Sequence, residues 1–194
     1  MPTARRVEKM HRVLKNRQPD LTIVCENIHD PHNVSAILRT CDSVGISKIN
    51  LLYTTTKFPK LGKKSSASAK KWIETERFNN HLELKETLKK QAITIYATRV
   101  VEHNSKSIYE VDWTKPSAII LGNEHLGVSE DAVAIADHDI YIPMFGMLES
   151  LNVSVAAAVI LYEACRQRIQ KNNYPNPSIN EELLTATLHQ WKEK

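Results

Sequence analysis

The sequence predicts an α/β protein built on a mainly parallel β-sheet. Short runs of apolar and β-branched residues alternate along the chain with segments whose apolar residues recur at helical spacing. Strands that alternate with helices favour parallel pairing, because each helix carries the chain back to the starting edge of the sheet. With 194 residues, the chain is long enough for one substantial core with extensions.

Six runs are predicted to be strands. They cover residues 21–26, 48–53, 72–78, 93–98, 117–121 and 139–142. The lysine-rich segment that ends at Lys71 has no clear periodicity and is interpreted as a surface loop, and the polar stretch 99–107 is interpreted as a second loop.

The helices are predicted from apolar spacing and from the residues at their ends. Residues 3–17 form a basic amphipathic helix that ends at Gln18-Pro19-Asp20. Four further helices have recognisable limits: one that stops at Gly45, one capped by Asn80, one over 129–137 capped by Ser129, and one over 180–191.

The stretch 142–164 passes from a strand through a turn into a long helix of small and branched residues. This helix is apolar on nearly every side, so we expect it to be buried. It is either a core helix with Ser150 or Asn152 as its N-cap, or a ligand site formed by the free backbone N–H groups of its first turn. The polar residues gather at its entrance: Glu149, Ser150, Asn152 and Ser154.

Ligands of parallel sheets bind beyond the carboxyl ends of the strands. In one of the loops expected there, Gly122 and Gly127 enclose a polar turn in which the backbone can approach a ligand closely. The spacing of these glycines matches neither GxGxxG nor GxxxxGK[ST]. This disfavours a nicotinamide-dependent oxidoreductase and a loop that binds a nucleoside triphosphate. The four loops are 27–33, 98–104, 122–128 and 143–151.

The net charge is only +4, but the basic residues gather in three parts of the chain. One basic run is usually a solvated surface, whereas three separate clusters suggest a polyanion such as nucleic acid. The clusters are Arg5, Arg6, Lys9, Arg12, Lys15 and Arg17; Lys57, Lys60, Lys63, Lys64, Lys70 and Lys71; and Arg166, Arg168 and Lys171.

Several other classes of function lack their sequence signals. The three cysteines lie in apolar runs without metal-type spacing, which indicates reduced thiols in a cytoplasmic protein. His29 and His32 have no further ligand beside them, so we expect no metal. We also expect no signal peptide, no membrane span and no serine or cysteine nucleophile.

Three segments, PHNVSAILRTCDSVG, AIILGNEHLGVSE and IPMFGMLESLNVSVAAAVILYEA, resemble in order the three motifs of the SpoU/TrmH class of RNA 2′-O-methyltransferases. The resemblance covers most of residues 18–170. It implies a SPOUT domain over 21–170 whose C-terminal part forms a deep trefoil knot, a basic RNA-binding helix over 1–20, and a linker and helix over 171–194. It also implies S-adenosylmethionine as the cofactor, a homodimer, and tRNA as the partner.

Within the class, the basic N-terminal helix and the EACRQR segment are similar to the subgroup that methylates the D-loop guanosine at tRNA position 18. The alternatives are 2′-O-methylation of another tRNA or rRNA nucleotide, and a non-catalytic RNA-binding homologue. A non-catalytic homologue is expected to lose Arg39 or Asn152, and both are present.

The resemblance also assigns residues to roles. The catalytic positions are Arg39, Asn33, Glu124 and Asn152. The cofactor is expected to lie against Thr98, Arg99, Leu121, Gly122, Ile142, Met144, Ser150 and Leu151. The residues expected to bind RNA are Arg5, Arg6, Arg12, Arg17, Arg166 and Arg168.

Two of the catalytic positions also have ordinary structural interpretations. Arg39 points away from the apolar stripe of its helix, as a solvated arginine does, and Asn33 stands where an N-cap is expected. An arginine is a poor base because its guanidinium stays protonated. We therefore favour Arg39 as a bidentate phosphate ligand that stabilises the developing oxyanion, while its role as the base remains the alternative.

Overall fold

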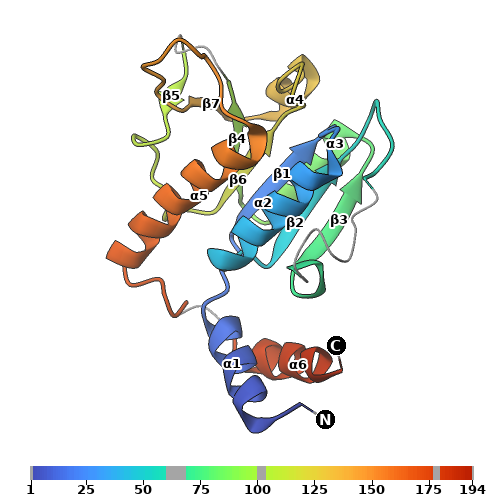
Figure 1. Ribbon diagram of the computed structural model, residues 1–194, viewed down its shortest axis with the longest axis vertical. Coiled ribbons are helices and arrows are strands. Elements are labelled where there is room, and N and C mark those ends of the chain that lie inside the picture. The colour runs from blue at the N-terminus through green and yellow to red at the C-terminus, as the bar shows by residue number, and fades with distance from the viewer. Residues whose placement is uncertain (1, 60–68, 100–103, 177–179, 194) are drawn as a thin grey trace.

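A seven-stranded sheet runs through the centre of the molecule, and all its paired strands are parallel (Figure 1). The computed structural model describes residues 2–59, 69–99, 104–176 and 180–193. The strand order is β3-β2-β1-β6-β4-β7-β5. The strands are β1 (Leu21–Glu26), β2 (Lys48–Leu52), β3 (Glu74–Phe78), β4 (Thr94–Thr98), β5 (Lys106–Ser107), β6 (Ser117–Leu121) and β7 (His138–Tyr141).

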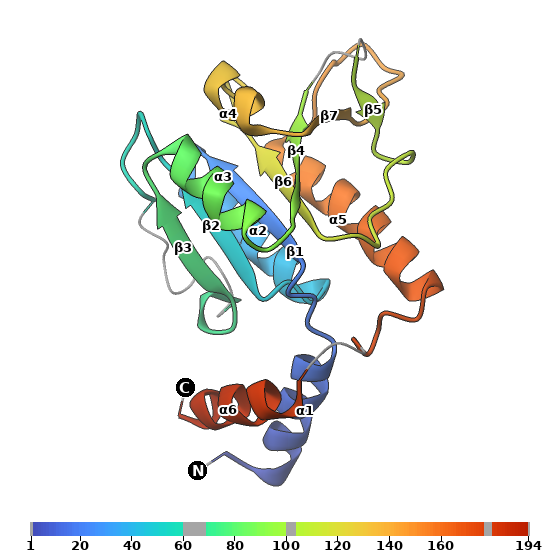
Figure 2. The same ribbon diagram turned by 180° about the vertical axis from the view of Figure 1, so that it is seen from behind.

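Helices cover both faces of the sheet, as the two opposite views show (Figures 1 and 2). α2 (Pro31–Ser43) and α5 (Val153–Gln170) pack on one face. α3 (His81–Lys89) and α4 (Glu130–Ile135) pack on the other. β1 and β6, at the centre, are buried along their whole length, which explains their largely apolar sequences. The predicted parallel α/β fold is therefore confirmed.

The predicted ends of three elements are corrected by hydrogen bonds that the sequence did not reveal. Asp30, not Asn33, caps α2, because its carboxylate accepts the backbone N–H of His32. α4 ends at Ile135 because Asp137 turns back to β4 and exchanges hydrogen bonds with Ile95. The segment 99–107 ends in β5, a two-residue edge strand that is too short for a periodicity signal.

We expected the helix after Leu151 to be buried on nearly every side. In a single copy of the chain this is wrong. One face of α5 packs on the sheet through Ala157, Ile160 and Leu161. The opposite face exposes a stripe of large apolar residues at helical spacing. These are Val155, Tyr162 and Ile169, which are 47%, 55% and 58% exposed.

The two ends of the chain form a separate helical pair at the opposite end of the molecule from α4 (Figures 1 and 2). α1 (Ala4–Lys15) and α6 (Glu181–Lys192) pack on each other through Met10, Leu14 and Trp191, and the partly buried Trp72 joins this cluster. The predicted N- and C-terminal extensions are thus in contact with each other.

Candidate functional site

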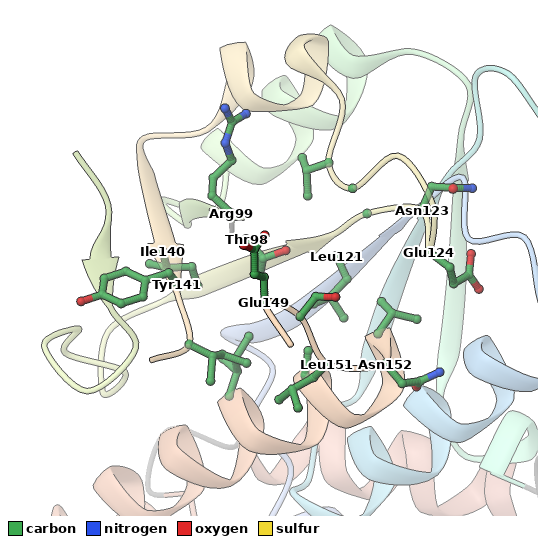
Figure 3. A pocket seen from close by; sticks show the side chains of 18 of the residues that line it. Thr98, Arg99, Leu121, Asn123, Glu124, Ile140, Tyr141, Glu149, Leu151 and Asn152 are labelled. Atoms are coloured by element: carbon green, nitrogen blue, oxygen red, sulfur yellow. The ribbon is translucent and has the colours of Figure 1, made fainter. Parts of the chain in front are cut away.

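A pocket of about 550 Å³ lies beyond the carboxyl ends of β4, β6 and β7 (Figure 3). This is where ligands of parallel sheets bind. The loops that follow these strands form its walls, and the first turn of α5 closes one side. All eight residues that the sequence analysis assigned to the cofactor line it, namely Thr98, Arg99, Leu121, Gly122, Ile142, Met144, Ser150 and Leu151.

At Gly122 the pocket is lined by backbone, because no side chain fits at this position. A Cβ atom on Gly122 would stand 2.1 Å from the carbonyl carbon of Gly127 and 2.2 Å from the nitrogen of Val128. Asn123 and Gly127 exchange backbone hydrogen bonds of 3.0 and 2.9 Å, which close the turn. The position therefore accepts only glycine, and the backbone is left bare to a ligand.

A chain of polar contacts joins three loops beside the pocket. The Glu124 carboxylate accepts hydrogen bonds from the backbone N–H groups of His29 (2.9 Å) and Asp30 (3.2 Å), and from the Asn33 amide (2.8 Å). The Asn152 amide in turn donates to the Asn33 side-chain oxygen at 3.2 Å. Glu124 and Asn152 lie on the same side of the pocket in Figure 3. The structure thus brings three of the four predicted catalytic residues together.

Asn152 also has the structural role that the sequence analysis considered. It is the N-cap of α5, and its side-chain oxygen accepts the backbone N–H of Ser154 at 2.9 Å. The cap and the contact with Asn33 use different ends of the same amide. One residue therefore fixes both the start of the helix and the polar chain.

The hydrogen bonds around Glu124 set its ionisation. Partial burial opposes the charged form, but the donors from Asn33, His29 and Asp30 outweigh it and hold the pKa of this carboxyl below its usual value. Glu124 is therefore a carboxylate at neutral pH, an acceptor that orders its neighbours.

Arg39 stands apart from the other predicted catalytic residues. It is exposed on α2 and does not line the pocket of its own chain. Within the part of the chain that the structure describes, it has neither a hydrogen bond nor an ion pair. The solvated orientation expected from the helical spacing is confirmed.

Glu26 fixes the backbone that follows the Gly122–Gly127 turn of the pocket. The sequence analysis did not identify this residue. This carboxylate is 1% exposed, accepts the backbone N–H of Ser129 at 3.0 Å and also accepts the Ser129 hydroxyl. It thereby ties the end of β1 to the N-cap of α4, which follows the Gly122–Gly127 turn. The available signal was a carboxylate that ends an otherwise largely apolar strand.

The sequence analysis also missed residues that line the pocket itself, among them Ile108 and Tyr141. Ile108 follows the short strand β5, and Tyr141 ends β7, which pairs with β5. Nothing in their local sequence distinguishes them, because their place in the pocket depends on this pairing.

Two arginines that were expected to bind RNA are buried instead, which corrects that prediction. Arg17 is 5% exposed and donates to Asp42 at 2.8 Å and to the carbonyl of Ile46 at 2.7 Å. Arg168 is fully buried, and its guanidinium binds Asp20 at 2.6 Å. Both cations are held by partners distant in sequence, so neither is available at the surface.

The other predicted RNA ligands are exposed. Arg5, Arg6 and Arg12 line a groove of about 940 Å³ along α1. Arg166 is exposed but forms a bidentate ion pair with Glu163, with both N–O distances 2.8 Å. In the second basic cluster, Lys60, Lys63 and Lys64 lie outside the described residues.

The described residues contain no group of three or more histidine, cysteine, aspartate or glutamate side chains that could hold a metal ion. Among them there is also no helix with the length and apolar character that a bilayer crossing requires. Burial raises the pKa of the Cys25 thiol to about 12, so this cysteine is not a nucleophile.

Comparison with known proteins connects this geometry to a family. The model of the SpoU rRNA Methylase family matches residues 20–162. The tRNA (guanosine(18)-2′-O)-methyltransferase of Thermus thermophilus is 45% identical over 192 residues, which are 99% of this chain and 98% of that protein.

Two solved structures extend the likeness. The TrmH/SpoU tRNA modifying enzyme of A. aeolicus superposes with a TM-score of 0.89 at 40% identity, covering 96% of this chain and 94% of that one. The SpoU methyltransferase AviRb of Streptomyces viridochromogenes, in complex with the cofactor AdoMet, superposes with a TM-score of 0.71 at 26% identity over 78% of this chain and 59% of that one.

Proposed function

The chain belongs to the SpoU rRNA methylase family, and on this premise we propose that it methylates the ribose 2′-hydroxyl of guanosine 18 in tRNA with S-adenosylmethionine as the donor. The observation that carries the proposal is the 45% identity, over nearly the full length of both chains, with a tRNA (guanosine(18)-2′-O)-methyltransferase. The resemblance also leads us to expect a knotted C-terminal segment.

The pocket fits the proposed cofactor. Its volume of about 550 Å³ lies within the range of small-molecule sites, and it combines an apolar wall with bare backbone at Gly122. Leu121, Ile142 and Leu151 suit the adenine ring. Glu149 offers a charge to the amine of the amino-acid part, and Arg99, which also pairs with Glu130 at 3.1 Å, offers one to its carboxylate. When bound there, S-adenosylmethionine supplies an electrophilic methyl group.

Positioning of the ribose oxygen is the main task of the protein in this reaction. We assign it to the polar chain, because Glu124, Asn33 and Asn152 fix three loops around one side of the pocket. Arg39 would bind the phosphate next to the target ribose and stabilise the charge that develops on the 2′-oxygen when the hydroxyl gives its proton to solvent water.

Arg39 does not line the pocket of its own chain, which directs attention to the pocket of a second copy. The Tyr162 hydroxyl of α5 lies 3.3 Å from the Ser43 hydroxyl of α2, and Arg39 is one helical turn before Ser43. Arg39 is therefore on the same face of α2 as Ser43, which meets the exposed apolar stripe of α5. We propose that this stripe is the interface of a homodimer and that Arg39 acts in the pocket of the partner.

A mixing experiment tests this arrangement. Arg39→Ala lacks the arginine, and Gly122→Ala has a displaced turn that binds the cofactor at least tenfold more weakly, so each alone is expected to have little activity at limiting S-adenosylmethionine. Co-refolded as heterodimers, they retain one intact composite site and regain methyl transfer. A protein that sediments as a monomer, or mixtures that stay inactive, would contradict the proposal.

The exposed arginines of α1 suit the phosphate backbone of tRNA. A tRNA substrate, together with the free cysteines among the described residues, fits a cytoplasmic protein.

The function itself is tested by mapping the methylated nucleotide. The purified protein is incubated with unmodified tRNA transcript and methyl-labelled S-adenosylmethionine, with Arg39→Ala as the matched control. Because Arg39 is exposed and has no partner among the residues that the structure describes, its removal should change the free energy of unfolding by less than about 0.5 kcal/mol while abolishing the label. Label at another ribose would refute guanosine 18, and bound cofactor without any label would indicate a non-catalytic RNA-binding protein.

A further inference from the structure

A further hollow is lined by residues of α1, of α6 and of the core. α1 and α6 lie at the end of the molecule opposite α4 (Figure 1). It encloses about 320 Å³, which is at the lower end of the range for ligand sites. We call it the tryptophan hollow. The residues that line it include Arg6, Lys9, Met10, Asp42, Trp72 and Trp191.

Two indole rings, held in place by their neighbours, form one wall of this hollow. The ring centroids of Trp72 and Trp191 are 4.9 Å apart, with their planes tilted by 59°. The Arg17 guanidinium lies over Trp191, 5.4 Å from its ring centroid, and donates to the backbone carbonyl of Trp72 at 3.3 Å. Trp191 is thus fixed and buried, while Trp72 is partly exposed and offers surface to a ligand.

The rim of the hollow is charged in a pattern that suits one kind of ligand. Arg6 and Lys9 are exposed and also line the basic groove of α1. Asp42 uses one carboxylate oxygen for Arg17, at 2.8 Å, and retains capacity to accept further hydrogen bonds. Cations beside an exposed aromatic ring are the combination that binds unpaired nucleotides, since phosphates pair with the cations while a base stacks on the ring.

Resting on the proposed tRNA substrate, we propose that the tryptophan hollow binds one unstacked nucleobase of the RNA. The base stacks on Trp72 and its amino group donates to Asp42, while the neighbouring phosphates lie on Arg6 and Lys9. The hollow is remote from the cofactor pocket, so it anchors a nucleotide other than the one that is methylated.

The test compares two short single-stranded RNAs of equal length and charge, one with guanine bases and one with abasic sites, at a single salt concentration. The wild-type chain should bind the base-bearing RNA roughly 5- to 100-fold more tightly. Trp72→Leu should reduce this ratio to less than about twofold, whereas Trp72→Phe keeps a ring and most of the ratio. If Trp72→Leu only disturbed the fold, it would weaken the binding of both RNAs by the same factor.

Charge variants separate the phosphate contacts from stacking. Lys9→Ala should weaken both RNAs equally and flatten the salt dependence of binding. The matched control is Lys90→Ala on the far side of the sheet, which removes an exposed lysine just after α3 and should leave both affinities unchanged. An effect of Lys90→Ala equal to that of Lys9→Ala would show that only overall charge matters.

Fluorescence provides a second measurement that needs no variant. Trp113 is fully buried, and the remaining two of the three tryptophans form the wall of the hollow. The base-bearing RNA should therefore quench the emission, and the abasic RNA should not. Equal affinity for the two RNAs, or a ratio that survives Trp72→Leu, overturns the inference.

These outcomes are distinct from those of the proposed function. Label at guanosine 18, together with equal binding of the base-bearing and the abasic RNA, would refute only the proposal that the hollow binds a nucleobase. A preference for bases without methyl transfer to any tRNA would refute the proposed function and leave the hollow as an RNA site.

Discussion

At the scale of single residues, the carboxylates beside the pocket act as acceptors that order the backbone. Glu124 accepts three N–H donors from the loop after β1 and from α2, and Glu26 accepts the backbone N–H and the hydroxyl of Ser129. Each joins segments that are more than 90 residues apart in the sequence. Such charge-assisted hydrogen bonds hold flexible loops in one arrangement, which a methyl transfer that depends on position requires.

The lowered pKa of Glu124 makes a prediction about pH. Because the folded state holds this pKa below that of the unfolded chain, the carboxylate contributes stability above about pH 5 and loses it as the pH falls through the folded pKa. Glu124→Gln should therefore be less stable than the wild type at pH 7, and the difference should shrink towards pH 3.

Urea unfolding midpoints of the two proteins across this pH range measure the difference. The other carboxylates titrate in the same way in both proteins, so they do not contribute to the difference between the two midpoints. A gap that stays constant from pH 7 to pH 3 would show that the ionised form of Glu124 does not stabilise the fold.

At the scale of elements, the turn between β6 and α4 shows how two glycines serve different needs. Gly122 lacks space for a Cβ because backbone atoms stand in its place, whereas Gly127 has open space but a positive φ of 71°. Asparagine tolerates positive φ, but no side chain fits at Gly122. The two positions therefore respond differently to substitution.

We expect Gly122→Ala to displace the turn, costing about 1–3 kcal/mol of stability and at least tenfold in cofactor affinity. Gly127→Asn should remain close to the wild type in both properties, within about 1 kcal/mol. Thermal unfolding and calorimetric titration with S-adenosylmethionine measure these effects. Equal losses in the two variants would mean that close backbone approach at Gly122 is not important.

At the scale of the whole molecule, buried arginines join the two halves of the sheet and the terminal helices. Arg168, near the end of α5, binds Gln18 and Asp20 before β1 and the carbonyls of Trp113 and Lys115 before β6. Arg17 joins the end of α1 to Asp42 and Trp72. The exposed arginines of α1 remain available for a ligand.

Arg168→Ala should therefore destabilise the protein by about 3–5 kcal/mol, since Asp20 and several carbonyls lose their partner. Arg5→Ala should leave stability unchanged within about 0.5 kcal/mol but weaken RNA binding and lower its salt dependence. Denaturant unfolding and binding isotherms at several salt concentrations distinguish the two. A stable Arg168→Ala protein with weakened RNA binding would restore the original interpretation of this residue.

Local sequence patterns predict the α/β class, most strands and helices, and the loops that form the pocket. These follow from local periodicity, capping residues and glycines, each of which acts over a few residues. Tertiary structure decided which arginines are buried, because the partners of Arg168 lie up to 150 residues away. It also decided the cap at Asp30, the edge strand β5 and the exposed stripe on α5. Burial of a charge or of an apolar face depends on what packs against it, and local pattern does not contain that information.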